Sequence, residues 1–353
     1  MQPASPQSTT KILLVGATGY IGGSILSHIT KSDPSAQVTA LIRSPDDVEK
    51  VNKWFPKVQI IQGDLSNETK VKEAAANANV IIYAARNTQN GLEALMDGLS
   101  SSHPCSSRHG ALFIMLSAII SLADPKNLRL GEEPPHDSNP ISDVDDAEAI
   151  KALPDHHWHV AQERAFFSLA EDRNSRGGRR VVTPVVMGLP LALGAGAGPV
   201  RTEGFVHDYV RAVARRAGEG AKGPFVMGQG RNVWSWCTTQ DIADAAWTIV
   251  NRWRDDEGRG WDEQLCGYYY VEAGQLVMRD VAYEVSRAVT GVEAAPEDCD
   301  SLQYPQFAQL MPVLPGLWGV TARCKADRLR RMGWTPKFTT WQPVVQQCAK
   351  AIV

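Results

Sequence analysis

The stretch KILLVGATGYIGG at residues 11–23 constrains the fold most, because an apolar run passes directly into closely spaced glycines. Residues 12–15 are all apolar, as in a parallel strand whose two faces are both covered. Gly16, Gly19 and Gly22 follow at regular intervals, and a helix is predicted to begin directly after the second of them. Glycine permits a tight turn and lets backbone approach a pyrophosphate, which a helix N-terminus attracts. The stretch therefore predicts a nucleotide site in an α/β fold.

Length, charge and cysteine usage narrow the class of protein. The 353 residues suffice for one cofactor domain that carries a smaller substrate lobe. A net charge of -3 gives no electrostatic reason for binding nucleic acid or an anionic membrane. The start of the chain has no apolar leader, and no apolar run approaches the about 18 residues of a membrane span, which predicts a cytoplasmic protein. The six cysteines lack metal-ligand spacing, so we expect reduced thiols, no bound metal and simple packing for Cys237.

Short apolar runs alternate with helical patterns along the rest of the chain, as expected of a parallel sheet covered by helices. Residues 125–154 are rich in proline and acidic side chains, which predicts a long loop with one short helix. Strands are predicted over 38–42, 58–62, 80–83, 112–116, 179–186 and 268–271, and helices over 20–30, 156–170, 206–217 and 281–289.

Three stretches resemble the extended short-chain dehydrogenase/reductase family of NAD(P)-dependent epimerases, dehydratases and reductases. They are the G-x-x-G-x-x-G spacing of GATGYIG, the run NVWSWCTTQDIAD at 232–244 and the run RCKADRLRRMGW at 323–334. The resemblance implies a Rossmann-type doubly wound parallel sheet with a smaller, interleaved C-terminal substrate lobe. The expected divisions are a flexible tail over 1–10, a cofactor domain over 11–188 to which 232–272 return, and a lobe built from 189–231 and 273–353.

The end of the second predicted strand, at Arg43, bears on the choice of cofactor. Arg43 lies about twenty residues beyond the last motif glycine, where NAD-binding relatives place an acidic residue on the ribose. A cation at this point favours the 2′-phosphate of NADP(H), and the alternative is a solvated surface arginine. Asp46 and Asp47 follow Ser44-Pro45, so we expect them in a turn or helix start rather than at the strand end.

The segment Gly63-Asp64-Leu65 follows the third predicted strand and resembles the part of the family that lies along the adenine. Asp64 is expected to accept a hydrogen bond from the adenine amine, with a helix N-cap as the alternative or additional role. TPVVMG at 183–188 is similar to the family's turn beside the nicotinamide. The motif and the resemblance together assign the cofactor contacts to Gly16, Thr18, Gly19, Tyr20, Ile21, Gly22, Arg43, Asp64, Leu65, Ala84, Ala85, Arg86, Ser117, Pro184 and Val186.

The proton donor that the resemblance implies is missing. The family uses a tyrosine in Y-x-x-x-K, but none of the eight tyrosines of this chain has a lysine four residues on. His159 and Glu163 stand in the corresponding frame H-V-A-Q-E, and their spacing predicts that Glu163 orients the imidazole and raises its pKa. Ser117 keeps the position of the family's polarising serine. The alternatives are a locally satisfied histidine and a strand-end hydroxyl that bonds nearby backbone.

Three functions therefore stay open at this point. The first is an NADP(H)-dependent reductase or dehydrogenase that acts on a small hydrophobic carbonyl compound, with secondary metabolism implied by the resemblance. The second is a non-redox lyase, isomerase or cyclase that retains NADP(H), which the missing tyrosine and lysine favour. The third is a cofactor-sensing regulatory protein without catalysis. The expected partner is a small hydrophobic substrate, and the protein is expected to be a monomer or a homodimer.

Overall fold

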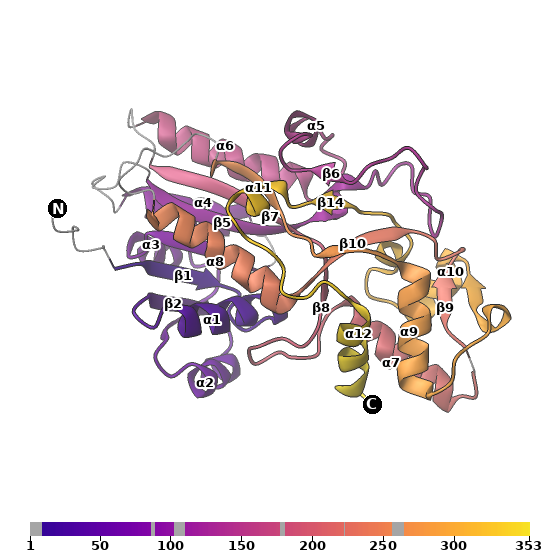
Figure 1. The fold of residues 1–353 in the computed structure, drawn as a ribbon. Helices are drawn as coiled ribbons and strands as arrows, with labels where there is room; N and C mark the ends of the chain where they lie inside the picture. Colours follow the sequence, from indigo (N-terminus) through magenta and orange to yellow (C-terminus); the bar gives the residue numbers. More distant parts are fainter. Residues whose placement is uncertain (1–8, 86–88, 102–109, 177–180, 222, 256–264) are drawn as a thin grey trace.

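A parallel sheet of seven strands, in the order β11-β7-β5-β4-β1-β2-β3, forms the larger part of the molecule (Figure 1). The computed structural model describes residues 9–85, 89–101, 110–176, 181–221, 223–255 and 265–353. All neighbouring strands of this sheet are parallel, so their C-terminal ends share one edge. The strands are β1 (Lys11–Val15), β2 (Gln37–Ile42), β3 (Gln59–Gln62), β4 (Val80–Tyr83), β5 (Ala111–Ala118), β7 (Val182–Leu189) and β11 (Gly267–Tyr270).

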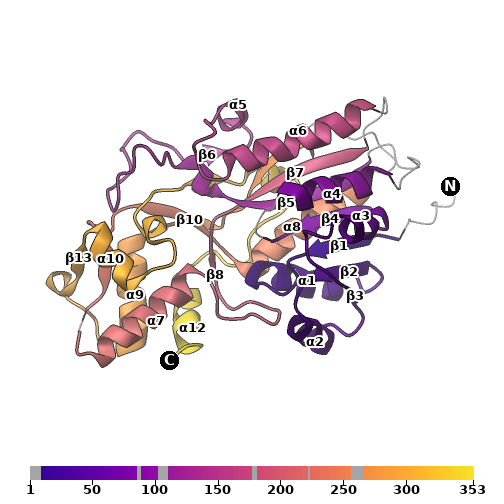
Figure 2. The same ribbon diagram turned by 180° about the vertical axis from the view of Figure 1, so that it is seen from behind.

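Helices cover both faces of this sheet (Figures 1 and 2). Alternate strand residues serve the two faces: Leu14 packs into the core on one side, and Leu13 into the core on the other. The helices on the Leu14 side are α1 (Tyr20–Ser32), α2 (Pro45–Trp54), α8 (Thr239–Asp255) and α11 (Asp327–Arg331), and those on the Leu13 side are α3 (Glu68–Ala76), α4 (Gln89–Ser101) and α6 (Val160–Arg176).

The chain reverses its direction of travel across the sheet between β1 and β4, and this point fixes where a ligand can bind. The chain builds β1, β2 and β3 outward on one side, then crosses to β4, β5 and β7 on the other. In open parallel sheets, ligands occupy the crevice outside the strand ends at such a switch point. The glycine turn directly after β1 lies there, so the topology and the motif agree on the nucleotide site.

A smaller lobe is built around a second sheet and an aromatic core that includes Tyr209, Phe225 and Trp318. We expected residues 232–272 to return to the cofactor domain. The helix α8 and the strand β11 do so, but β10 joins β8 and β12 in the smaller sheet, so that part of the prediction is wrong. The elements are β8 (Leu191–Leu193), β10 (Val233–Thr238), β12 (Gly274–Val277), β9 (Phe225–Met227), β13 (Asp300–Leu302), α7 (Phe205–Gly218), α9 (Met278–Thr290), α10 (Tyr304–Leu310) and α12 (Gln342–Lys350).

The long acidic segment before α6 is tied to the C-terminal part of the chain by Asp143. Its carboxylate accepts the backbone N–H groups of Tyr270 and Arg328, each at 2.9 Å. Burial raises the pKa of Asp143 to about 6, although these two hydrogen bonds act in the opposite direction. The segment carries β6 (Ile141–Ser142), which pairs with β14 (Cys324–Lys325), and the short helix α5 (Ala147–Lys151).

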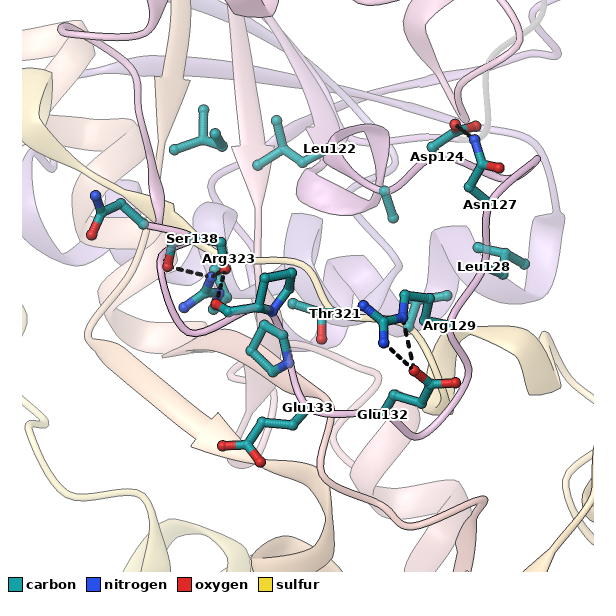
Figure 3. A pocket seen from close by; sticks show the side chains of 16 residues that line it. Leu122, Asp124, Asn127, Leu128, Arg129, Glu132, Glu133, Ser138, Thr321 and Arg323 are labelled. Carbon is teal, nitrogen blue, oxygen red and sulfur yellow. Dashed lines mark hydrogen bonds and ion pairs between the residues drawn. The ribbon is translucent and has the colours of Figure 1, made fainter.

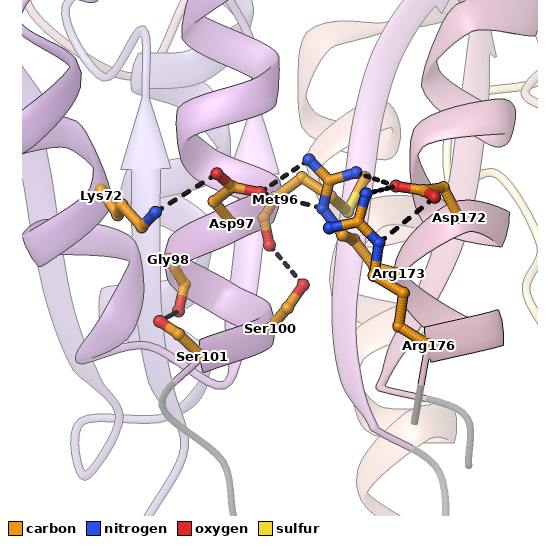
Figure 4. A network of polar contacts seen from close by, with 9 residues as sticks. All are labelled: Lys72, Met96, Asp97, Gly98, Ser100, Ser101, Asp172, Arg173 and Arg176. Atoms are coloured by element: carbon orange, nitrogen blue, oxygen red, sulfur yellow. Dashed lines mark hydrogen bonds and ion pairs between the residues drawn. The ribbon is translucent and has the colours of Figure 1, made fainter. Parts of the chain in front are cut away.

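A charged network fixes α6 to the neighbouring helices (Figure 4). The carboxylate of Asp97 on α4 accepts two hydrogen bonds from the guanidinium of Arg173 on α6, at 2.9 and 2.7 Å. Lys72 on α3 reaches the same carboxylate at 3.3 Å. Both donors of Arg173 reach the same oxygen, Oδ1, of Asp97. Arg173 is largely buried, so this charged pair is better placed to orient α6 than an exposed ion pair.

Two expectations about the whole chain concern membranes and thiols. In the part of the chain that the structure describes, no helix has the length and apolarity needed to cross a membrane. Cys237 packs in the buried core, and burial raises its pKa well above that of an ordinary thiol, in line with a packing role. Cys105 lies outside the described residues.

Candidate functional site

A pocket of about 420 Å³ lies at the C-terminal ends of β1, β2, β3 and β4. Strand ends and the loops that follow them supply its walls, as expected at the switch point of a parallel sheet. Six predicted cofactor residues line it, together with residues that were not assigned. The predicted ones are Gly16, Thr18, Arg43, Asp64, Leu65 and Ala85, and the others are Val15, Leu41, Ile42, Asp47 and Gly63.

The turn after β1 has the backbone that a pyrophosphate site requires. Gly16 has a φ of +89°, and a Cβ there would lie 2.5 Å from the carbonyl oxygen of Ala84. A Cβ on Gly22 would lie 2.1 Å from the carbonyl oxygen of Gly16, so Gly22 allows the helix to pack on the turn. A Cβ on Gly19 would meet only one described atom within 4 Å, the Gly16 carbonyl oxygen at 3.5 Å. The space in front of Gly19 is therefore open, at the N-terminus of α1, where an anionic group fits.

Charged groups at the far wall of this pocket bear on the cofactor. The Arg43 side chain is 84% exposed, and its Nη1 lies 4.0 Å from Oδ2 of Asp64. Asp64 also accepts the backbone N–H of Ser66 at 2.9 Å, while the cap of α3 is supplied by Asn67. The N-cap alternative for Asp64 is therefore wrong. Asp47 lines the same pocket because α2 begins directly after the strand end, which brings its first turn back to the ribose side.

Several predicted cofactor residues lie elsewhere. The Tyr20 ring is buried, and its hydroxyl donates to the carbonyl of Gly194 in the smaller lobe, so only its backbone faces the turn. Pro184 and Val186 are buried inside β7, which continues to Leu189, so these two assignments are wrong. The prediction placed the strand end too early, since the interruption comes at Pro190. The backbone N–H groups of Ile21 and Gly22 belong to the first turn of α1, Ala84 packs on the glycine turn, and Arg86 lies outside the described residues.

A second, apolar cavity of about 200 Å³ lies at the same edge of the sheet, beyond β5 and β7. Since all these strands are parallel, this cavity and the nucleotide pocket share one edge of the sheet. Among its described lining residues, His159 alone carries an ionisable side chain. The others are Ala118, Ile120, Leu189, Pro190, Leu191, Phe205, Trp234, Met278, Leu314, Leu317 and Trp318.

His159 directly precedes α6, and its backbone sets the direction of the imidazole. Its φ is +67°, a left-handed conformation that is uncommon outside glycine, and its carbonyl accepts the N–H of Glu163 at 2.9 Å. Partial burial lowers the pKa of His159, and its hydrogen bond is with Gln162. The prediction that Glu163 orients the ring and raises its pKa is wrong, because His159 is not on the helical face that Glu163 occupies.

Glu163 belongs to a different cluster, which it forms with Ser117 of β5 and Tyr268 of β11. Its buried carboxyl group accepts a hydrogen bond from the Ser117 hydroxyl and a second from the Tyr268 hydroxyl. Burial raises the pKa of Glu163 to about 7, and the two hydrogen bonds oppose that change. Because strand residues alternate between faces, Ser117 points to α6 while its neighbour Ala118 lines the cavity. Ser117 and His159 therefore do not converge on one reacting atom.

Comparisons with known proteins agree with this geometry. Residues 16–134 match the NAD(P)H-binding family. The chain is 29% identical to Oxidase ucsJ of Acremonium sp, over 93% of each chain. It has the fold of UDP-glucose-4-epimerase from Stenotrophomonas maltophila with bound NAD, at a TM-score of 0.66, 13% identity and 97% coverage of each chain. It also resembles dTDP-glucose 4,6-dehydratase of Bacillus anthracis in complex with NAD, at a TM-score of 0.64 and 13% identity, over 97% of this chain and 96% of that one.

Residues 16–134 form an NAD(P)H-binding domain, and the whole chain has the fold of the NAD-bound epimerase and dehydratase structures. This assignment confirms the predicted family resemblance and the doubly wound parallel sheet. Within that fold, the chain lacks the Y-x-x-x-K motif, and its cavity wall carries Ala118 and His159.

Sequence reasoning also missed features on the cavity side of the site. Tyr268 was placed in a strand, but its contact with Glu163 joins residues far apart in sequence, and no local pattern signals it. The alternation of β5 could have identified Ala118 as the cavity residue, given a correct strand end. Pro190, directly after an apolar run, was the available signal for the true end of β7.

The raised pKa of Glu163 makes stability depend on pH. A folded-state pKa of about 7, above the ordinary 4.5, means that the protonated form is favoured in the folded state. The contribution of the protonated Glu163 to the free energy of unfolding is fully present below pH 4.5 and is lost as the pH rises through about 7. At about 1.4 kcal/mol per tenfold change in proton affinity, the loss is on the order of 3 kcal/mol. We expect Glu163→Gln to flatten this part of the stability profile, measured by urea unfolding from about pH 4.5 to pH 8.

Glu171 on the same helix provides the matched control, because it is exposed. Glu171→Gln should leave the pH profile of the wild type unchanged. The pKa of Asp143 is also raised, so Asp143 makes stability fall with rising pH in the wild type and in both variants alike. Parallel profiles for wild type and Glu163→Gln would show that Glu163 ionises in the folded protein as it does in the unfolded chain.

Proposed function

We propose that the protein is an NADP(H)-dependent oxidoreductase that acts on a small hydrophobic carbonyl compound. The observation that carries the proposal is the apolar cavity with His159 in its wall, on the same sheet edge as the nucleotide pocket. Its volume of about 200 Å³ lies below the about 300–1,000 Å³ of typical ligand sites, which favours a small substrate. When bound, NADP(H) supplies or accepts a hydride. His159 would then donate a proton to the substrate oxygen or remove one.

The lining of the cavity favours a mostly apolar substrate. Trp234 and Trp318 line it and are almost fully buried. Their Nε1 atoms are buried away from the cavity and have no hydrogen-bond partner among the described residues, so the indoles offer the cavity their apolar ring surface. His159 is the ionisable side chain of the described lining that a substrate oxygen would meet.

The preference for NADP(H) rests on Arg43. Its exposed guanidinium stands on the pocket wall at the end of β2, where it can pair with a 2′-phosphate. Hydrogen bonds to charged groups contribute about 1.5–3 kcal/mol each, so Arg43→Asp should weaken NADPH binding by roughly 10–100-fold and reverse the preference. Fluorescence titration with NADPH and NADH measures both affinities.

Asp47 is the matched control, since its carboxylate lines the same pocket and pairs with Lys50 at 2.9 Å. We expect Asp47→Asn to keep or strengthen NADPH binding, because it removes a negative charge near the 2′-phosphate. Wild-type protein that binds NADH as tightly as NADPH would contradict the assignment. An acidic residue in the pocket would then hold the ribose, as in NAD-binding relatives.

A non-redox lyase, isomerase or cyclase is the second candidate, and the cavity wall favours it. The Y-x-x-x-K motif is absent from the sequence, and Ala118 brings no hydroxyl to the cavity. In that case His159 would act as acid and base while NADP(H) stays unchanged. A cofactor-sensing protein is less well supported, because sensing the cofactor alone does not require a second, apolar cavity at the edge of the sheet that holds the nucleotide pocket.

The deciding experiment is turnover of a panel of small hydrophobic ketones and aldehydes with NADPH, followed by nicotinamide absorbance and product mass spectrometry. The proposal requires one NADPH oxidised for each carbonyl reduced. Product formed without any change in nicotinamide absorbance would support the non-redox candidate.

A role in secondary metabolism is our proposal as well, supported by the similarity to the fungal oxidase.

A further inference from the structure

Two adjacent histidines and an aspartate come together outside the cofactor pocket and the apolar cavity. Asp124 follows the 3-10 helix η1 (Ile119–Leu122) after β5, and His156 and His157 lie between α5 and α6. Oδ1 of Asp124 lies 3.1 Å from Nε2 of His156 and 3.9 Å from Nε2 of His157. One ligand atom from each of the three residues lies within 4.8 Å of the other two.

A hydrogen bond from the backbone orients His157. Its side chain is only 8% exposed, and its Nδ1 lies 2.8 Å from the carbonyl oxygen of Ser121. A carbonyl oxygen only accepts hydrogen bonds, so Nδ1 carries the proton and Nε2 presents its lone pair toward Asp124. Metal-bound histidines characteristically donate their second ring N–H to such an acceptor.

The carboxylate of Asp124 is held in place as well. It accepts the backbone N–H of Lys126 at 2.9 Å and the side-chain amide of Asn127 at 2.5 Å. Figure 3 shows Asp124 and Asn127 bonded to each other at the edge of a pocket of about 240 Å³. The opposite side of that pocket carries Arg323, bonded to Ser138. Of the three residues, only Asp124 lines that pocket. The side chains of Asp124 and His156 are each about one-third exposed, so an ion can reach the cluster from solvent.

We propose that Asp124, His156 and His157 bind one divalent transition-metal ion of the Zn²⁺ type. Two imidazole nitrogens and one carboxylate suit Zn²⁺ and its first-row neighbours, whereas Mg²⁺ and Ca²⁺ prefer oxygen ligands. Metal–ligand bonds of about 2.0–2.1 Å place ligand atoms about 3–3.5 Å apart. Asp124 and His156 already lie at such a separation, and His157 lies somewhat farther away, with all three ligand atoms within 4.8 Å of one another. Side-chain rotations that draw the three atoms together would complete the site.

The bound ion joins the segment after β5 to the segment before α6. These two segments also carry Ala118 and His159, which line the apolar cavity. Binding therefore stabilises the wall of the cavity, and this role does not depend on which reaction the protein catalyses. The sequence offers no recognisable metal motif here, because Asp124 and His156 are 32 positions apart.

The test is titration of untagged, full-length protein with Zn²⁺ by calorimetry, with the visible spectrum of bound Co²⁺ as a second readout. Wild type should bind one Zn²⁺ per chain and unfold at a higher temperature with it. Asp124→Asn, His156→Gln and His157→Gln should each weaken binding by at least about tenfold. His28→Gln is the matched control, because His28 faces Asp244 at 3.6 Å and the described residues place no third His, Cys, Asp or Glu ligand beside this pair. It should bind Zn²⁺ as wild type does.

Three outcomes would overturn the proposal. They are no Zn²⁺ binding by the wild type, Zn²⁺ affinities of all three variants equal to that of the wild type, or a wild-type affinity for Mg²⁺ equal to that for Zn²⁺. His157 is buried, so His157→Gln can fail to fold. Asp124→Asn and His156→Gln alter side chains that are about one-third exposed, and they carry the test by themselves.

Discussion

Replacing Gly19 with alanine is expected to abolish cofactor binding and leave the fold intact. The new methyl group would meet only the Gly16 carbonyl oxygen, at an ordinary contact distance of 3.5 Å, and Gly19 has a φ of -76° that alanine readily adopts. The methyl group would occupy the open space at the N-terminus of α1, where the pyrophosphate must approach the backbone. Losing two hydrogen bonds to a charged group at about 1.5–3 kcal/mol each weakens binding by roughly 10²–10⁴-fold.

Gly22→Ala is the informative contrast. A Cβ there would lie 2.1 Å from the Gly16 carbonyl oxygen and 3.3 Å from the Cβ of Ala84, so the turn itself must move. This variant should lose both thermal stability and cofactor binding, while Gly19→Ala keeps the wild-type melting temperature. Thermal unfolding and cofactor fluorescence separate the two. NADPH affinity within a few-fold of wild type in Gly19→Ala would place the cofactor away from the glycine turn.

The nucleotide turn could be predicted from sequence because its determinants are local. The apolar strand, the glycine spacing and the helix start all fall within residues 11–23, and steric limits on the backbone leave few ways to connect them. Arg43 was assigned from its spacing after the motif glycines, and Asp64 and Leu65 were assigned from the family resemblance. All three line the pocket, because parallel strands end at a common edge. Asp47 was missed, since its place in the pocket depends on α2 beginning directly after β2.

The catalytic side was harder to predict, because small local errors change which face a side chain occupies. The prediction began the helix before His159, whereas the helix begins at Val160, and that difference separates His159 from Glu163. The prediction also ended β5 near Ser117, whereas the strand includes Ala118. Neighbouring strand residues face opposite sides, so the Ser117 hydroxyl points to Glu163 of α6 and Ala118 takes the place in the cavity wall. Boundaries depend on tertiary packing more than on local propensity, and these two errors reflect that dependence.

The contact between Glu163 and Tyr268, and the place of β10 in the smaller sheet, are long-range results of folding. The sequence around Tyr268 is an aromatic run that fits any buried strand. The run at 232–244 was matched to a family pattern, yet the pattern did not specify which sheet β10 would join. Such choices follow from how the two lobes pack together, which a single sequence does not display.

His159→Ala is expected to lower turnover by about 10²–10⁴-fold, the usual loss when a general acid or base is removed. His159 alone among the described lining residues of the cavity can transfer a proton near neutral pH. The nucleotide pocket does not include His159, so the affinity for NADPH should stay unchanged. Single-turnover kinetics with saturating NADPH isolate the chemical step from substrate binding.

His159→Asn separates proton transfer from hydrogen bonding at this position. Asparagine tolerates the left-handed backbone that His159 adopts at a φ of +67°, so the start of α6 should be preserved. Its amide can donate a hydrogen bond to a substrate oxygen, but it does not release a proton. If His159 transfers a proton, the asparagine variant should be as slow as His159→Ala. Near wild-type turnover in His159→Asn alone would show that His159 only orients the substrate. Near wild-type turnover in both variants would remove His159 from the mechanism, and the cavity would then act by binding and orientation alone.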